Sequence, residues 1–284
     1  MVSSAGGFTV QVTPHVYTLH IDEDSSSSGV MHPGGSNIFF VGNPATEMVL
    51  IDTGERYRKW TRQILDYHAW LGDPKIPSIL ITHGHDDHIG GVDRLQEIFG
   101  STVRCHPKLV SKLESILGPG NVVKLNSREI VRVGRATLKA LFTPGHELDH
   151  ISYYLSVDRV LFTGDTVLGS SSTTVRDLGP YMKSLELLSR YDNVQVFPAH
   201  GPIVRSGSKR IRAYREHREE RENQILFALK QGLTDVYEIV TAIYPRNLRR
   251  ALREAASRNV QTHLAKLVRE GQVVESAASF RLNR

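Results

Sequence analysis

The stretch THGHDDHIGG, residues 82–91, places three histidines and two aspartates within six positions, directly after the apolar run SILI. Neutral imidazole and carboxylate are good ligands for Zn²⁺, and carboxylates also accept harder metals such as Mn²⁺. His83 and His85 are two residues apart, so in an extended chain they point to the same side. Asp87 and His88 follow in the turn, where they can face a second ion. This stretch therefore predicts a metal site without cysteine ligands.

Further histidines and aspartates stand at the ends of apolar runs elsewhere in the chain. Chains place binding loops at the C-terminal ends of strands, so we expect these side chains to converge with the histidine cluster. They are Asp52, His146, Asp165 and His200. The combined set is too large for one tetrahedral ion that keeps an open position. It indicates two ions that share a bridging carboxylate and a bridging water.

The elements that must position these residues alternate between strand and helix patterns. Helical spacing predicts helices at 58–72, 90–100 and 180–191. Two β-rich blocks with interspersed helices predict an α/β fold with two sheets inside helical layers. Apolar runs that end in turn residues predict the strands, at 38–42, 48–54, 76–82, 101–107, 136–145, 151–157, 159–165 and 194–201.

The pattern changes after Pro202. A long charged amphipathic helix is expected over residues 207–231, followed by two more helical segments and the short strand-like run QVVE. Three helices and a β-wing are the outline of a winged helix. We therefore expect a catalytic domain over residues 1–204 and a small C-terminal helical, winged-helix-like domain over residues 205–284.

The motifs at the strand ends resemble those of the metallo-β-lactamase-fold hydrolases, in the order of that family. They are LIDTG (50–54), THGHDDH (82–88), TPGH (143–146), FTGD (162–165) and PAHG (198–201). The stretch after Asp165 and the helical tail resemble one subgroup more closely, the lactamase-beta-2-like proteins, which carry a C-terminal winged-helix-like domain. The resemblance implies the αββα four-layer sandwich of the family.

The resemblance also implies roles for single residues, with two Zn²⁺ per chain and Mn²⁺ or Fe²⁺ as alternatives. Asp52 would orient the histidine loop, because metal-binding histidines need an outer partner. His150, four residues past His146, is a candidate outer partner or substrate contact. The motifs assign His83, His85 and His146 to the first ion, Asp87, His88 and His200 to the second, and Asp165 to the bridge between them.

The segment SSTTVRDLGPYM, residues 171–182, is expected at the mouth of the site because it follows Asp165 closely. Thr173, Thr174 and Tyr181 are candidates for substrate contacts or oxyanion donation. The alternative is a structured loop in which Tyr181 packs on the following helix. The SSSS run and the MHPGG segment near the N-terminus form either a rim of the site or a plain surface loop.

Two metal ions would lower the pKa of a bound water and yield a hydroxide that attacks a carbonyl carbon or phosphorus. Asp87 or Asp165 would hold the hydroxide and take up a proton. We expect a dinuclear metal-dependent hydrolase that cleaves a small-molecule ester, thioester or lactone. Within the family, the aspartate at position 165 disfavours β-lactam hydrolysis. The alternative is an endoribonuclease that cleaves single-stranded RNA, as some lactamase-beta-2-like relatives do; a non-catalytic binding protein is a third hypothesis.

The net charge of +5 is unevenly distributed. Residues 1–55 carry six acidic side chains and no Lys or Arg, whereas residues 204–284 carry 17 Lys or Arg against 9 Asp or Glu. A basic tail supplies phosphate contacts for RNA, but this one is poor in the aromatic residues that stack bases. A lid over the site, a homodimer surface and a solvated helical face are the alternatives. The arginines concerned are Arg246, Arg249, Arg250, Arg253 and Arg258.

A single cysteine, Cys105, excludes an internal disulfide and is typical of a protein in a reducing compartment. The N-terminal residues lack the basic and apolar regions of a secretory signal. No apolar run approaches the roughly 20 residues that span a bilayer. We therefore expect a cytoplasmic protein without a membrane partner.

Overall fold

The computed structural model describes residues 11–22, 35–245, 247, 249–276 and 279–283. The SSSS run, most of the MHPGG segment and Arg246 lie outside these residues. The expected rim near the site therefore stays a prediction.

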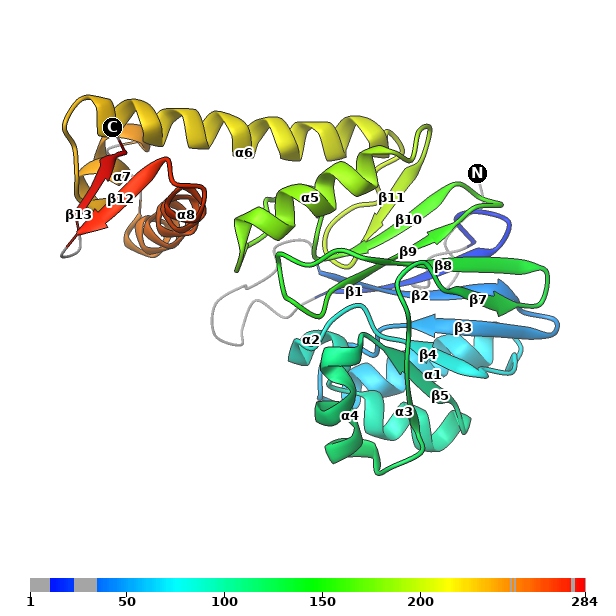
Figure 1. Ribbon diagram of the computed structural model, residues 1–284. Coiled ribbons are helices and arrows are strands. Elements are labelled where there is room, and N and C mark those ends of the chain that lie inside the picture. The colour runs from blue at the N-terminus through cyan, green and yellow to red at the C-terminus, as the bar shows by residue number, and fades with distance from the viewer. Residues whose placement is uncertain (1–10, 23–34, 246, 248, 277–278, 284) are drawn as a thin grey trace.

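Two mixed β-sheets lie face to face in the larger part of the molecule (Figure 1). In the first sheet the strands lie in chain order, antiparallel from β1 to β3 and parallel from β3 to β6. Its strands are β1 (Val16–Ile21), β2 (Ser36–Asn43), β3 (Glu47–Ile51), β4 (Ser78–Leu80), β5 (Thr102–Cys105) and β6 (Val122–Lys124).

The second sheet has the strand order β11-β10-β9-β8-β7, in which only β10 and β11 pair in parallel. Its strands are β7 (Ile130–Val133), β8 (Ala136–Phe142), β9 (Ile151–Leu155), β10 (Val160–Gly164) and β11 (Gln195–Pro198). Each strand expected from an apolar run is present, most of them shorter than predicted. The strands β1, β6 and β7 were not expected.

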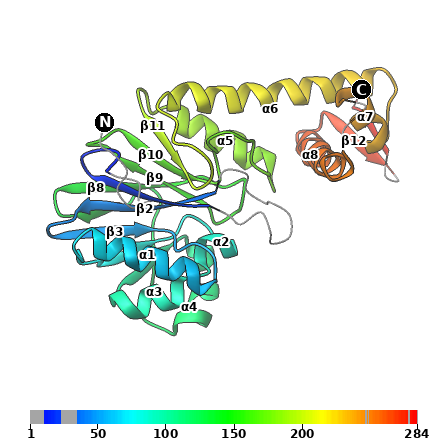
Figure 2. The same ribbon diagram turned by 180° about the vertical axis from the view of Figure 1, so that it is seen from behind.

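Helices cover the outer face of each sheet, so the four layers follow the predicted αββα order (Figures 1 and 2). Below the first sheet lie α1 (Arg58–Trp70), α3 (Val92–Phe99) and α4 (Val110–Leu117). Above the second lie α5 (Leu178–Ser189) and the first half of α6 (Gly207–Lys230). Two short helical turns, α2 (Asp86–Ile89) and η1 (Pro107–Leu109), complete this part. No described helix has the length and apolar character that crossing a membrane requires.

Strand β2 shows how the layers hold together. Side chains alternate between the faces of a strand, and here both faces are covered. Phe40 points to the core shared with α1, while Phe39 and Val41 point to the core between the two sheets. Each buried phenylalanine stabilises the fold by about 1.5–3 kcal/mol. The metal-binding motifs thus start from strands that are fixed on both sides.

The C-terminal part has its own small core and two-stranded sheet, as expected for a winged helix. It contains α7 (Val236–Ile243), α8 (Arg250–Arg269), β12 (Val273–Ser276) and β13 (Ser279–Leu282). Helix α6 contributes to both parts: Ile211 packs in the core under α5, whereas Ile225 packs against α7 and α8. The expected division after residue 204 stays a prediction, and α6 physically joins the two cores.

Candidate metal centre

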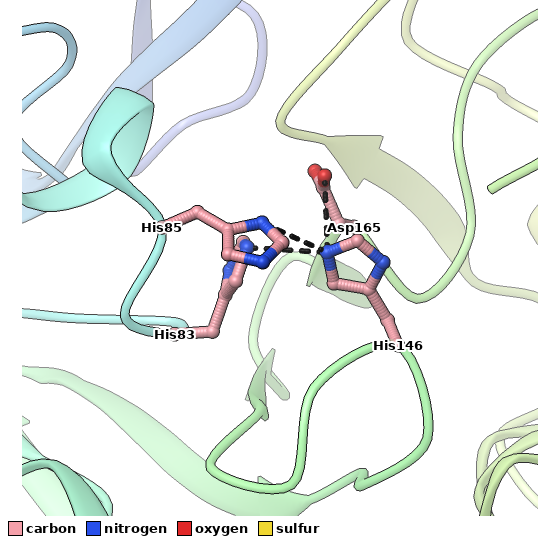
Figure 3. Close-up of side chains that lie close together, drawn as sticks. All are labelled: His83, His85, His146 and Asp165. Atoms are coloured by element: carbon pink, nitrogen blue, oxygen red, sulfur yellow. Dashed lines mark hydrogen bonds and ion pairs between the residues drawn. The ribbon is translucent and has the colours of Figure 1, made fainter. Parts of the chain in front are cut away.

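Three histidines and one aspartate meet at the end of the sandwich where β4, β8 and β10 end (Figure 3). The Nε2 atom of His146 lies 3.3 Å from Nε2 of His83 and 3.3 Å from Nδ1 of His85. It also lies 3.5 Å from Oδ2 of Asp165. Burial lowers the pKa of His83 and of His146, so these imidazoles are neutral. Converging lone pairs of neutral imidazoles are what a Zn²⁺ ion requires.

A second group of potential ligands lies beside the first. Nε2 of His200, which follows β11, is 3.1 Å from Oδ2 of Asp87, and Nε2 of His88 is 3.5 Å from the same oxygen. Burial lowers the pKa of His88, but the charges of Asp87, Asp52 and Asp165 outweigh burial and raise that pKa to about 10. Three carboxylates around His88 concentrate negative charge, which a second cation would neutralise.

Asp165 lies between the two groups. Its Oδ2 faces His146, whereas its Oδ1 is 3.3 Å from Nε2 of His200 and 3.6 Å from Nε2 of His88. Burial raises the pKa of this carboxyl, but the neighbouring histidines outweigh burial and lower it, so the group is ionised. Among the described residues, neither Oδ1 of Asp165 nor Nε2 of His88 has a hydrogen-bond partner, although both atoms are buried. Buried polar atoms are rarely left unpaired, so these two fit a site for a cation.

Asp52 fixes the histidine loop from behind, where the sequence placed it. Its Oδ2 accepts a hydrogen bond from Nδ1 of His88 at 2.8 Å, and its Oδ1 accepts one from the backbone N–H of Thr82 at 2.8 Å. The hydroxyl of Thr82 donates to Oδ2 as well. Asp52 itself adopts a left-handed conformation, with φ of 61°. When a metal takes the place of the proton on Nε2, these bonds keep the remaining proton of His88 on Nδ1.

The other histidines also have a partner on the nitrogen that faces away from the site. Nδ1 of His200 lies 3.0 Å from the hydroxyl of Ser36, and Nε2 of His85 lies 3.2 Å from the carboxylate of Glu147. Nδ1 of His146 donates to the carbonyl of Thr174 at 2.8 Å. Sequence reasoning missed Ser36 and Glu147. The position of Glu147 directly after the TPGH motif was the only available signal.

His150 is an outer partner rather than a substrate contact. It is fully buried, and its Nε2 accepts a hydrogen bond from the backbone N–H of Asp165 at 3.1 Å. Its Nδ1 lies 2.9 Å from the hydroxyl of Thr143. Burial lowers the pKa of His150 well below its usual value, so the ring stays neutral. Its role in this structure is to hold the segment that carries Asp165.

The expected substrate contacts in the segment 171–182 need correction. Tyr181 is fully buried, and its hydroxyl donates to the carbonyl of Thr166 at 2.7 Å, so it is not offered to a substrate. The hydroxyl of Thr173 lies 3.0 Å from Nδ1 of His146 and is nearly buried. Thr174 accepts from Nδ1 of His146 through its backbone carbonyl, and its side chain is exposed. Thr173 and Tyr181 are therefore buried supports of the site, whereas a substrate contact by the Thr174 side chain stays a prediction.

Comparison with known proteins agrees with this geometry. A model described as Metallo-beta-lactamase superfamily matches residues 31–200, and one described as Beta-lactamase associated winged helix domain matches residues 236–281. Beta-lactamase-like protein 2 homolog from Caenorhabditis elegans is 34% identical over 245 residues, which cover 84% of this chain and 80% of that protein.

Two further relatives bear on the fold and on the chemistry. Atrochrysone carboxyl ACP thioesterase from Aspergillus chevalieri is 32% identical over 242 residues, which cover 82% of this chain and 74% of that protein. The crystal structure of a beta-lactamase domain protein from Burkholderia ambifaria superposes with a TM-score of 0.80 at 21% identity, covering 99% of this chain and 95% of that chain. This chain belongs to the metallo-beta-lactamase superfamily, as a metal-dependent hydrolase with an associated winged helix domain.

Proposed function

We propose that this chain is a dinuclear hydrolase that cleaves an acyl thioester. The observation that carries the two-metal proposal is the placement of Asp165, whose two oxygens each face a separate group of histidines. Zn²⁺ is the proposed metal because imidazole nitrogens dominate both groups. The proposed ligands are His83, His85 and His146 for one ion, Asp87, His88 and His200 for the other, and Asp165 for both.

Zn²⁺ held by these residues would supply Lewis acidity, which activates water near neutral pH and stabilises negative charge on a substrate oxygen. The protein's own residues provide orientation and proton transfer. The side chain of His85 is 41% exposed, whereas His83 and His88 are buried, so substrate reaches the site past His85. Asp87, whose side chain is 12% exposed and whose Oδ2 lies 3.1 Å from Nε2 of His200, is the proposed acceptor of a proton at its carboxylate.

A thioester is the proposed substrate class because one relative at 32% identity is an ACP thioesterase by name. Its match extends over both the catalytic part and the tail of this chain. RNA is the competing substrate, favoured by exposed arginines at the start and in the middle of α8, namely Arg249, Arg250 and Arg258. The two classes differ in salt dependence, because RNA binding releases counterions and weakens steeply as salt increases.

The test combines metal analysis with two substrates. Protein loaded with Zn²⁺ is given an acyl N-acetylcysteamine thioester and a labelled single-stranded RNA, alongside Asp165→Asn. The exposed Asp66→Asn serves as the control with the same chemical change. We expect thioester turnover that falls more than about a hundredfold in Asp165→Asn, since even outer partners of a metal contribute 10–100-fold. RNA cleavage that is lost in Asp165→Asn, with no thioester turnover, would refute the proposed substrate.

A further inference from the structure

Arg218 is a buried cation at the middle of α6, between the two cores of the molecule. Only 4% of it is exposed, and within the described ranges no carboxylate forms an ion pair with it. A buried charge without a counter-charge costs free energy unless its hydrogen bonds compensate. The hydrogen-bond partners of Arg218 therefore indicate its role in the structure.

One partner lies in the catalytic part, in the segment that holds His146. Nη2 of Arg218 donates to the backbone carbonyl of Thr173 at 2.7 Å. The hydroxyl of Thr173 lies 3.0 Å from Nδ1 of His146, and the carbonyl of the next residue, Thr174, accepts from the same nitrogen. Arg218 thus binds the backbone of Thr173, which together with Thr174 orients the His146 ring.

The other partner lies in the winged helix domain. Nη1 of Arg218 donates to Oδ1 of Asn259, on α8, at 2.9 Å. Asn259 is held in turn, because its amide donates to the hydroxyl of Tyr244 at 3.0 Å. The guanidinium also lies over the ring of Tyr181, 5.6 Å from its centroid. A rigid, planar guanidinium suits such a two-sided contact better than a lysine does.

A second contact between α8 and the same segment has a similar arrangement. Arg269 donates to both carboxylate oxygens of Asp177, at 2.6 Å and 2.9 Å. The backbone N–H of Asp177 donates in turn to the carbonyl of Gly145, the residue before His146. The winged helix domain therefore contacts the segment that holds His146 at two points, through Asn259 and through Arg269.

We propose that Arg218 is a positioning residue for His146, and that through Asn259 the winged helix domain sets the affinity of the metal site that contains His146. This inference rests on the proposed two-metal site. Arg218 touches neither metal nor substrate. It fixes the backbone at Thr173, and the adjacent carbonyl of Thr174 then accepts from Nδ1 of His146. This bond keeps the proton of His146 on Nδ1 and its Nε2 toward His83 and His85.

The test measures metal affinity in the full-length protein by competition with a fluorescent zinc chelator, together with the absorption spectrum of Co²⁺-loaded protein. Arg218→Met removes the guanidinium but keeps an unbranched stem. We expect a loss of affinity for one of the two ions of about tenfold, as for other outer partners of metal ligands, and an altered Co²⁺ spectrum. Arg218→Lys replaces the guanidinium by a single ammonium group, so it should recover part of the metal affinity that is lost in Arg218→Met.

Arg210→Met is the matched control on the same helix. Arg210 also donates to two backbone carbonyls of the loop between β10 and α5, those of Leu168 and Ser171, and lies over the ring of Tyr214. It does not bond to Thr173. We expect its metal affinity and Co²⁺ spectrum to match those of the wild type. An equal loss in Arg210→Met, or wild-type affinity in a folded Arg218→Met, would overturn the inference.

Asn259→Ala tests the domain link without altering Arg218, and keeps the inference testable if Arg218→Met does not fold. Loss of one hydrogen bond predicts an affinity lowered by about two- to tenfold. Unchanged affinity and spectrum in Asn259→Ala would overturn the domain coupling. A wild-type protein that binds no metal would instead refute the proposed function, while two bound ions with unaffected variants would refute only this inference.

Discussion

Replacing Asp52 by asparagine tests the proposed second metal site most sharply. The asparagine side chain has the same size as that of Asp52, and asparagine tolerates the left-handed backbone that Asp52 adopts, with φ of 61°. Residue 52 is 4% exposed, so no bulk water takes the place of its hydrogen bonds. The substitution therefore changes charge and hydrogen bonding while it leaves the backbone in place.

The three donors around Asp52 decide how the new amide is oriented. The backbone N–H of Thr82 can only donate, so the amide oxygen must stay at the position of Oδ1. The amide NH₂ then takes the position of Oδ2, opposite Nδ1 of His88. The hydroxyl of Thr82 can rotate, but His88 must move its proton to Nε2 to accept from the amide. A protonated Nε2 cannot bind a metal.

We expect the site of Asp87, His88 and His200 to lose 10–100-fold in metal affinity, equivalent to about 1.4–2.7 kcal/mol. The site of His83, His85 and His146 should lose less, because none of its histidines bonds directly to Asp52. Titration with Zn²⁺ against a fluorescent chelator resolves the two equivalents, with the exposed Asp66→Asn as the control. Two equivalents bound by Asp52→Asn with wild-type affinity would refute the tautomer argument.

Two further predictions concern the support of the site. In Gly145→Ala, the new Cβ would lie 2.4 Å from Cα of Tyr181, and the φ of 143° already disfavours a side chain; we expect thermal melting to show destabilisation by more than about 2 kcal/mol, and an unchanged Tm would contradict the packing described. The hydrogen bond from Arg269 lowers the pKa of Asp177 against the opposing effect of burial. The stabilisation by this pair is therefore present above the unfolded pKa of about 3.9 and disappears as the pH falls through the lower folded pKa. Asp177→Asn, which keeps the N-cap oxygen, should lower the stability by about 0.5–1 kcal/mol at pH 7 and by progressively less as the pH falls below about 3.9; a stability difference that stays constant over this pH range would rule out the ion pair as the cause.

The convergence of the candidate metal ligands could be predicted from sequence because each one ends an apolar run. His83, His146 and Asp165 follow β4, β8 and β10, and the sheets bring these strand ends together. The spacing of the histidine cluster is local, so it is visible in a short window. The same reasoning predicted a layered α/β fold with two sheets inside, since apolar runs of strand length alternate with helical patterns, whereas the four-layer αββα order came from the resemblance to the family.

Asp52 and His150 were predicted as outer partners, but Ser36 could not be, because it comes from a distant segment without a local pattern. Ser36 lies 164 residues before His200, and its hydroxyl could serve at any surface. For Tyr181, in contrast, the sequence suggested a role that the structure does not support. Its place after the Asp165 motif suggested a substrate contact, yet the close approach of Gly145 and the carbonyl of Thr166 bury it completely. Nearness in sequence to the Asp165 motif predicts that a residue lies close to the site. Whether its side chain faces the substrate or the protein core depends on packing, which the sequence does not show.

The role of α6 depends on burial in the same way. Its sequence is highly charged and predicts a solvated surface helix, and the exposed Arg212 and Arg215 are consistent with that. Arg218 is the exception, because it lies where the core of the catalytic part ends and the core of the winged helix domain begins. At that position a long side chain can reach both Thr173 and Asn259. The periodicity of the helix predicts a buried stripe, but only the packing of two domains on one helix explains why a cation belongs in it.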